Sequence, residues 1–160
     1  MKISIRRANE SDLDRIVNLF ERTVSVINSK HYTPTEIEAW LDDPSRDDRF
    51  LDKIETQLFY VCIDEKEDIV GFSSITESGY YDLLYVSTDH QREGIGQLLM
   101  EQILVAAKIR KCNEIEADVS ITAVPFFEEN GFEVIKEQYV ERNCVKLKNF
   151  KMIKSLPSTS

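Results

Sequence analysis

Two glycines lie between a segment typical of a β-strand and a segment typical of a helix. The strand-like segment is residues 81–86, the helix-like segment is residues 98–110, and Gly94 and Gly96 stand between them. The first turn of a helix leaves backbone N–H groups unpaired, and the helix dipole favours negative charge there. A glycine lets the backbone approach a bulky phosphate, because it has no Cβ. With Arg92 as a nearby positive charge, this segment predicts a site for a diphosphate group.

The spacing of the two glycines is also typical of a simple tight turn before a helix, so both interpretations stay open at this point. Two other nucleotide-binding loops do not fit. The dinucleotide fingerprint needs a third glycine where this chain has Leu99, and no Gly-Lys-Ser/Thr triplet of a phosphate-binding loop occurs.

The length of 160 residues and the hydrophobic share of 42% are typical of one compact domain. We expect a single domain over residues 1–153 and a disordered tail over residues 154–160. No apolar run is long enough to cross a bilayer, and no apolar segment follows the basic residues of the start, so neither a membrane anchor nor a signal peptide is expected. Three cysteines without a Cys-x-x-Cys pair argue against a disulfide framework or zinc site and favour a cytoplasmic protein.

The formal net charge of −9 argues against a general nucleic-acid binder, which needs a basic face. The charge suits a cationic substrate such as an amine. It is equally typical of carboxylates that only keep the surface soluble. The chain has two histidines and no clustered metal ligands, so we expect no metal site.

The hydrophobic periodicity predicts an α/β fold, with a mixed sheet and helices on both of its faces. An amphipathic helix follows Asn9, and Thr33-Pro34-Thr35-Glu36 is a capping box that begins a second helix. A further helix is expected through Phe50 and Ile54. The strands are expected at residues 3–5, 58–63, 69–76, 81–86, 114–119, 134–140 and 144–152, and a short helix at residues 123–130.

Two motifs resemble the GNAT superfamily of acetyl-CoA-dependent N-acetyltransferases. The first is the strand end Leu84-Tyr85-Val86 with the loop Gln91-Arg92-Glu93-Gly94-Ile95-Gly96, and the second is residues 123–132, Ala-Val-Pro-Phe-Phe-Glu-Glu-Asn-Gly-Phe. The order of elements matches this family along nearly the whole chain. The stretch from His31 to Trp40, together with residues 120–128, resembles the YafP-like subgroup more narrowly.

The resemblance implies a mostly antiparallel sheet whose fourth and fifth strands splay apart to admit acetyl-CoA. Backbone groups of Leu84 and Val86 would pair with the pantetheine amides, and the Val86 N–H would polarise the thioester carbonyl. Amides from Arg92 to Gln97 would hold the pyrophosphate. The implied cofactor-binding residues are Leu84, Tyr85, Val86, Gln91, Arg92, Glu93, Gly94, Ile95, Gly96, Gln97, Ser120 and Phe127.

The chain departs from the family pattern at two positions. Phe127 occupies the place of the tyrosine that often acts as general acid, and Ser120 that of a frequent asparagine. Phe127 has no proton to give, so that role cannot be carried over. A thiol with a pKa near ~8.5 is a tolerable leaving group, so protonation by water can suffice.

Transfer needs a neutral amine, so a carboxylate near the thioester is expected to accept its proton, either directly or through water. Asp82 and Glu77 are the local candidates, and Glu116 and Asp118 lie on the facing strand. Asp82 is preferred because it lies on the cofactor strand itself. Tyr81 and Ser120 are further catalytic candidates. Each of these side chains also has an ordinary interpretation as a solvated strand charge, a packing residue or a helix cap.

The acceptor is expected between the first helices, against His31, Tyr32, Trp40 and Tyr80. The predicted function is transfer of an acetyl group to a primary amine, more readily of a small molecule than of a protein, by direct attack in a ternary complex. The alternatives are a peptide or protein N-acetyltransferase, and a module that binds coenzyme A with little turnover. We expect a monomer or homodimer with no nucleic-acid or membrane partner.

Overall fold

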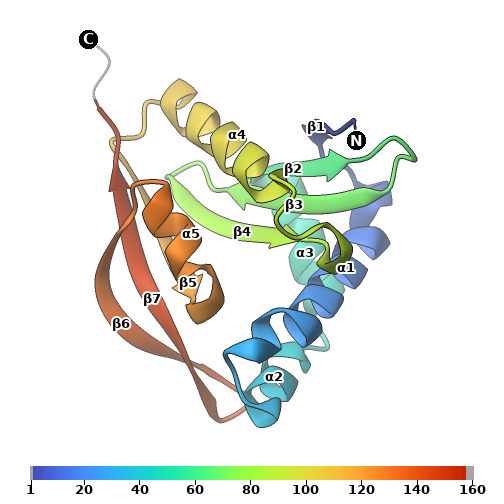
Figure 1. The fold of residues 1–160 in the computed structure, drawn as a ribbon, viewed down its shortest axis with the longest axis vertical. Coiled ribbons are helices and arrows are strands. Elements are labelled where there is room, and N and C mark those ends of the chain that lie inside the picture. The colour runs from blue at the N-terminus through green and yellow to red at the C-terminus, as the bar shows by residue number, and fades with distance from the viewer. Residues whose placement is uncertain (1, 158–160) are drawn as a thin grey trace.

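The computed structural model describes residues 2–157, and this part of the chain forms a seven-stranded sheet with helices on both faces (Figure 1). The strand order is β1-β2-β3-β4-β5-β7-β6, and every neighbouring pair is antiparallel except β4 and β5. The strands are β1 (Ser4–Arg7), β2 (Leu58–Ile63), β3 (Ile69–Ile75), β4 (Tyr80–Val86), β5 (Glu114–Ser120), β6 (Glu133–Arg142) and β7 (Val145–Ser155). The helices are α1 (Leu13–Val26), α2 (Pro34–Leu41), α3 (Arg46–Thr56), α4 (Ile95–Ile109) and α5 (Val124–Glu129).

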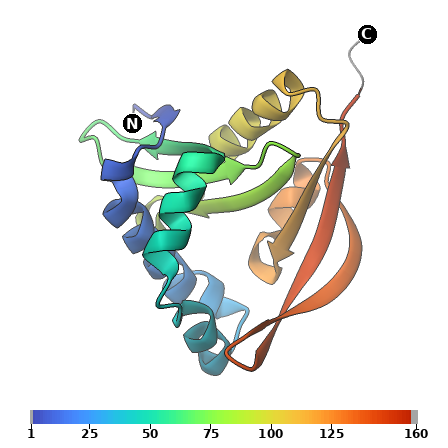
Figure 2. The same ribbon diagram turned by 180° about the vertical axis from the view of Figure 1, so that it is seen from behind.

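The sheet opens between its two central strands. β4 and β5 pair only where Tyr80 lies opposite Glu116 and Tyr81 opposite Ala117, although each strand has seven residues. Beyond these pairs the strands diverge, so one edge of β4 has no strand partner (Figure 2). The predicted splay between the fourth and fifth strands is therefore confirmed.

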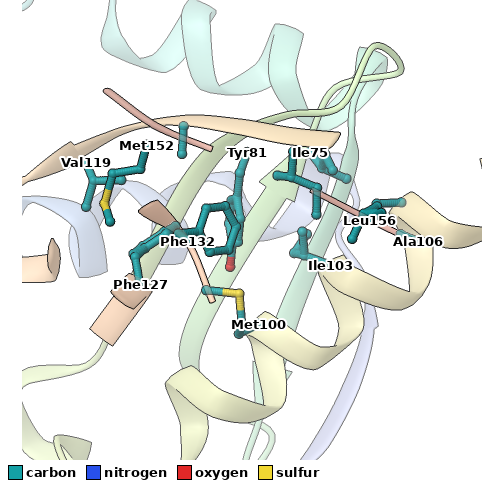
Figure 3. Close-up of a cluster of buried hydrophobic side chains, with 13 residues drawn as sticks. Ile75, Tyr81, Met100, Ile103, Ala106, Val119, Phe127, Phe132, Met152 and Leu156 are labelled. Carbon is teal, nitrogen blue, oxygen red and sulfur yellow. The ribbon is translucent and has the colours of Figure 1, made fainter. Parts of the chain in front are cut away.

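Alternating side chains of the strands pack against the two helical layers. On one face, Phe59 and Val61 of β2 join the core cluster that includes residues of α1 and α3. On the other face, the neighbouring Cys62 packs with Leu99 of α4. A third cluster lies between α4, α5 and the second half of the sheet, and Figure 3 shows Met100 among its members. This two-sided packing confirms the predicted mixed α/β sheet.

Both predicted helix starts in the N-terminal region are present. Asn9 and Thr33 each form a capping box, and Pro34 occupies the first turn of α2. The start of α4 differs from the prediction. It begins at Ile95, three residues before Leu98, because Ile95 is itself buried in the core and extends the helix toward the glycine loop.

The predicted disordered tail starts too early. Lys154 and Ser155 belong to β7, Leu156 is buried, and its N–H donates to the Asn113 carbonyl at 2.8 Å. These residues complete the ladder of β7 with β5, which pairs Ser155 with Glu114. The rest of the predicted tail, residues 158–160, lies outside the described residues. Among those described, no helix is both long and apolar enough to span a bilayer.

Candidate active site

A cavity of about 460 Å³ runs from the start of α4 along the open edge of β4. It is lined on one side by the end of β4 and on the other by β5 and the residues after it. Of the twelve residues predicted to bind the cofactor, all except Glu93 line this cavity: Leu84, Tyr85, Val86, Gln91, Arg92, Gly94, Ile95, Gly96, Gln97, Ser120 and Phe127.

The loop before α4 turns sharply at two left-handed positions. Arg92 has φ 63° and Gly94 has φ 84°, and Gly94 precedes the first residue of the helix. The first backbone bond of the helix runs from the Leu98 N–H to the Gly94 carbonyl. The N–H groups of residues 95–97 therefore have no partner within the helix, as expected for a first turn. This cradle suits a diphosphate.

The two glycines have different roles. A Cβ at Gly94 would meet no atom within 4 Å, so glycine serves the backbone turn there rather than a close approach. A Cβ at Gly96 would lie 3.6 Å from both Val86 Cγ2 and Phe126 Cζ. Because both of these residues line the cavity, a longer side chain at position 96 would occupy cavity space.

The Val86 carbonyl is engaged by side chains. It accepts hydrogen bonds from Thr23 Oγ1 at 3.1 Å and from Gln91 Nε2 at 2.8 Å. This carbonyl is one of the groups expected to pair with pantetheine, and such pairing requires the Gln91 side chain to turn away. In an extended strand the N–H and carbonyl of one residue point to the same side. The Val86 N–H therefore points the same way as its carbonyl, toward the open edge of β4.

A β-bulge places Asp82 beside this cavity. Ser74 pairs with Leu83 and Ile75 pairs with Tyr81, so Asp82 has no partner on β3. The bulge sends the side chains of Asp82 and Leu83 to the same face, toward α1 and α3, while Tyr81 points to the α4 face. Asp82 thereby reaches both this first cavity, which we call the cofactor cavity, and a second cavity.

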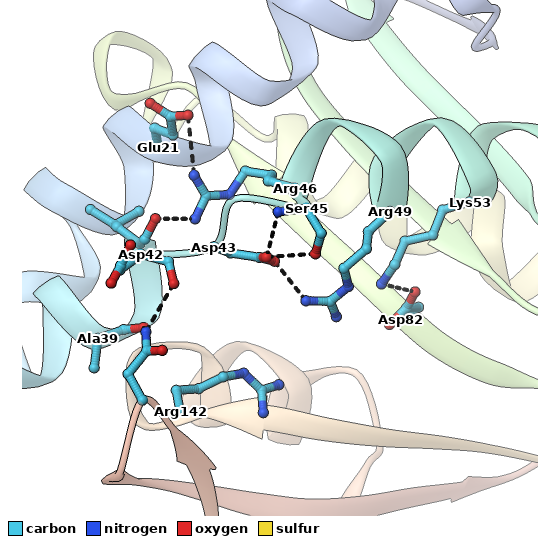
Figure 4. Close-up of polar contacts among 12 residues, drawn as sticks. Glu21, Ala39, Asp42, Asp43, Ser45, Arg46, Arg49, Lys53, Asp82 and Arg142 are labelled. Carbon is cyan, nitrogen blue, oxygen red and sulfur yellow. Dashed lines mark hydrogen bonds and ion pairs between the residues drawn. The ribbon is translucent and has the colours of Figure 1, made fainter.

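The second cavity, of about 410 Å³, adjoins the first under α2 and α3. We call it the acceptor cavity. Eight residues line both cavities: Trp40, Asp82, Leu83, Tyr85, Asp118, Val140, Arg142 and Asn149. The charged residues that line the acceptor cavity are Asp42, Asp43, Arg46, Arg49, Lys53, Asp82, Asp118 and Arg142. Figure 4 shows most of them.

Asp82 is held by two donors from α3 and its end. Lys53 Nζ lies 2.7 Å from the carboxylate oxygen Oδ2, as Figure 4 shows. Gln57 Nε2 lies 2.9 Å from the same oxygen. The side chain of Asp82 is 15% exposed. Within residues 2–157 its other oxygen, Oδ1, accepts no hydrogen bond, so a proton acceptor remains at the junction of the two cavities.

Asp118 of β5 faces Asp82 across the splay. It accepts hydrogen bonds from the Tyr80 hydroxyl at 2.7 Å and from Gln138 Nε2 at 2.6 Å. Burial and the Asp118 carboxylate raise the pKa of Tyr80 above its usual value, so its hydroxyl remains a proton donor to Asp118. Tyr80 lines the acceptor cavity, where the sequence analysis placed it.

Tyr81 lies in the core cluster and also lines the cofactor cavity, and its catalytic role stays a prediction. Its side chain is 3% exposed and packs against Phe127, with ring centroids 5.4 Å apart. The hydroxyl points into the core near Met100 (Figure 3), and burial raises its pKa. Phe127 packs on Phe132 in the same cluster, as a core residue that borders the cofactor cavity.

The other predicted residues are placed as follows. Glu77 is exposed in the turn between β3 and β4 and lines neither cavity, so the structure does not bring it to the site. Ser120 lines the cofactor cavity and also accepts from the Ala123 N–H as a helix cap. His31 is exposed, contacts Thr122 Oγ1 at 2.9 Å and lines neither cavity.

Tyr32 and Trp40 lie beside the site. The Tyr32 hydroxyl donates to the Lys148 carbonyl at 2.7 Å and accepts from the Ile121 N–H at 3.0 Å. Its ring packs edge-on against Trp40, which borders both cavities. The Tyr32 hydroxyl therefore links the segment before α2 to β7. Trp40 is the residue of this pair that reaches the acceptor cavity.

Residues 28–154 match the family model of the acetyltransferase (GNAT) domain. The chain belongs to the GNAT superfamily. It is 34% identical to the uncharacterized N-acetyltransferase YafP of Escherichia coli over 94% of each chain. It is 26% identical to the peptidyl-lysine N-acetyltransferase YjaB of Salmonella typhimurium, covering 88% of this chain and 90% of the relative. This GNAT protein is accordingly an acetyl-CoA-dependent acyltransferase, consistent with a YafP-like member.

Solved GNAT structures share the fold over nearly the whole chain. A GCN5-related N-acetyltransferase from Rhodopseudomonas palustris superposes with a TM-score of 0.91 at 24% identity, covering 98% of this chain and 97% of that one. The PaiA N-acetyltransferase from Thermoplasma acidophilum, solved with coenzyme A, gives a TM-score of 0.79 at 20% identity, covering 98% and 100%. Both likenesses concern the fold.

The sequence pattern did not mark several residues that line the cavities, among them Thr23, Lys53 and Arg142. A signal for one of them was present. Arg46, Arg49 and Lys53 are spaced by three and four, so they lie on one face of α3. No comparable pattern marks Arg142, which reaches the site only through the long β6–β7 hairpin.

Proposed function

We propose that this GNAT enzyme transfers the acetyl group of acetyl-CoA to a primary amine of a small molecule, by direct attack in a ternary complex. The observation that best supports this proposal is that two cavities meet at Asp82. One suits the cofactor, and the other is lined by α2, α3 and the β6–β7 hairpin. Two adjoining sites allow both substrates to be present at once, so a covalent enzyme intermediate is not needed.

Acetyl-CoA supplies an activated acyl group on a thiol that leaves readily. The N–H groups of residues 95–97 and Arg92 would bind its diphosphate. The Val86 N–H would donate to the thioester oxygen as negative charge develops there. Ser120 and Phe127 would border the bound cofactor.

Asp82 would accept the proton of the incoming ammonium through its free oxygen, either directly or through one water molecule. Lys53 and Gln57 would hold the carboxylate in place. Residue 127, which lines the cofactor cavity, is a phenylalanine and has no proton to give. The departing thiolate would therefore take its proton from water.

A protein acceptor is the second candidate, because one relative is a peptidyl-lysine N-acetyltransferase. The β6–β7 hairpin supports the small molecule instead. Asn143 at its tip donates to the Ala39 carbonyl at 3.1 Å and to the Asp42 carbonyl at 2.9 Å, which closes one end of the acceptor cavity. Cytoplasmic location and a monomeric or dimeric state stay predictions.

The test compares two variants of α4 for acetyl-CoA binding by calorimetry and for acetylation of a panel of amines. Gly96→Asp places a charged side chain in the cavity and should abolish binding and turnover. Val105→Asp adds the same charge on the exposed face of the same helix and should leave both unchanged.

Micromolar acetyl-CoA affinity in Gly96→Asp would contradict the assignment of the loop. Binding by the unmodified enzyme without transfer to any amine in single-turnover experiments would favour the module that binds coenzyme A with little turnover. Transfer to peptide lysine but to no small amine would favour the protein acetyltransferase.

A further inference from the structure

The acceptor cavity has a cationic end, formed by Arg142 at the end of β6 and by Arg49 of α3. In Figure 4 the guanidinium of Arg142 extends toward the side of the cavity where Arg49 lies. Two like charges that line one cavity repel each other, and an anion placed between them would relieve this repulsion.

The other two cations that line the cavity already have protein partners. Arg46 pairs with Glu21 at 3.2 Å, donates to the Leu41 carbonyl and lies over the Phe20 ring. Lys53 pairs with Asp82. Neither is available to a ligand without losing a protein partner.

The guanidinium groups of Arg49 and Arg142 differ in the protein partners that they have. Arg49 Nη1 pairs with Asp43 Oδ2 at 2.7 Å. Arg142 forms no ion pair within residues 2–157, and its one hydrogen bond there runs from Nη1 to the Glu141 carbonyl at 3.1 Å. Asp42 also lines this end of the cavity without an ion partner, but Figure 4 places it away from the Arg142 guanidinium.

The backbone next to Arg142 is fixed in place. Asn143 and Cys144 have φ 49° and 64°, as in a two-residue hairpin turn, and Arg142 pairs with Val145 across it. The Asn143 amide is bound to two carbonyls at the end of α2. Arg142 therefore projects from a hairpin tip that is tied to the opposite wall, which suits a group that recognises a ligand.

Two of the four carboxylates that line the acceptor cavity flank the splay between β4 and β5. These two, Asp82 and Asp118, line both cavities, as Arg142 does, whereas Asp42 and Asp43 line the acceptor cavity alone. An ammonium group placed between Asp82 and Asp118 would lie at the junction with the cofactor cavity. The charges of the acceptor cavity thus match a molecule with an amine at one end and an acid group at the other.

We propose that the acceptor is a small amine that carries an acid group, a carboxylate or a phosphonate, which the guanidinium of Arg142 binds. This inference rests on the proposed function and names the substrate class of the same site. Arg142 then selects among amines, while Asp82 accepts the proton from the one that is bound.

The experiment measures kcat/KM for matched amine pairs that differ only in the acid group. Suitable pairs are phenylalanine with phenethylamine, lysine with cadaverine, and aminomethylphosphonate with methylamine. We expect the member with the acid group to be preferred by about tenfold to a hundredfold, as for a hydrogen-bonded charge pair. The carboxylate and phosphonate pairs distinguish the two kinds of acid group.

Arg142→Gln should reduce this preference to near unity by raising the KM of the acid-bearing amine. Arg142→Lys keeps the charge but loses the paired donors, so it should retain part of the preference. Lys146→Gln is the matched control, because Lys146 is an exposed cation in the same hairpin that lines neither cavity.

Three results would overturn the proposal. The first is an unmodified enzyme that acetylates amines without preferring the acid-bearing members, which leaves the proposed function intact. The second is an Arg142→Gln variant whose loss falls on the KM of acetyl-CoA, because Arg142 would then serve the cofactor. The third is the absence of transfer to any amine, which removes the proposed function as well.

Discussion

At the scale of single residues, the decisive position is Asp82. Its place on a strand would ordinarily make it one of many solvated charges, and the β-bulge changes that by turning it to the same face as Leu83. Lys53 and Gln57 then bind one oxygen and leave the other at the junction of the cavities. Tyr81, the adjacent residue, points to the opposite face and packs in the core.

Asp82→Asn should lower kcat about 100-fold with little change in the KM of acetyl-CoA, because it removes the proton acceptor and leaves the glycine loop intact. Lys53→Gln should lower kcat less, because Lys53 acts by holding the carboxylate. Steady-state kinetics with the best amine of the panel measures both. Glu77→Gln is the contrasting variant, and a loss of rate there with full activity in Asp82→Asn would reverse the assignment.

At the scale of elements, the start of α1 depends on a buried carboxylate. Asp12 accepts from Arg6 at 2.8 and 2.9 Å, from Arg15 at 2.7 Å and from the Asn9 N–H at 2.9 Å. These bonds, above all those from Arg6, hold the pKa of Asp12 below its usual value. The network joins β1 to α1, which carries Thr23 to the end of β4.

Asp12→Asn should reduce the free energy of unfolding at pH 7 by about 2 kcal/mol, because it leaves two arginines without their charged partner. A carboxylate whose pKa is lowered by folding stabilises the fold at pH values above its pKa in the unfolded chain, which is about 4. This contribution is lost as the pH falls through its pKa in the folded protein. The difference from the unmodified protein should therefore shrink below about pH 4.

Urea unfolding at several pH values tests this prediction. Asp14→Asn, which changes an exposed carboxylate two residues along the chain, should change stability little at any pH. A difference for Asp12→Asn that stays constant down to pH 3 would show that the charge of Asp12 is not the source of its effect.

At the scale of the whole molecule, the open edge of β4 divides the sheet into two parts that share only two residue pairs. A cofactor in the cavity would contact β4 and α4 on one side and Ser120 on the other. Binding would therefore stabilise both parts together. The overall charge of −9 does not reveal these anion sites, because the proposed recognition of anions is local, at the start of α4 and at Arg142.

Coenzyme A at 100 times its Kd should stabilise the protein by about 2.7 kcal/mol, which corresponds to a rise in Tm of about 5–10 °C. Pantetheine at the same concentration should give a smaller rise, because it lacks the diphosphate that the N–H groups of residues 95–97 would bind. Thermal unfolding followed by fluorescence measures both. Equal shifts with the two ligands would contradict the role of the glycine loop.

The amino-acid sequence was enough to place most helices and strands and to mark the glycine loop before α4. Periodicity and capping residues such as Asn9 and Thr33 act over a few neighbours, and the glycine loop is a continuous segment, so both can be read along the chain. The acceptor cavity could not be predicted in this way and is visible only in the folded chain. Arg142, Lys53 and Asp82 come from a hairpin, a helix and a bulge that are distant in sequence, and their meeting depends on strand pairing and on the tie from Asn143 to α2.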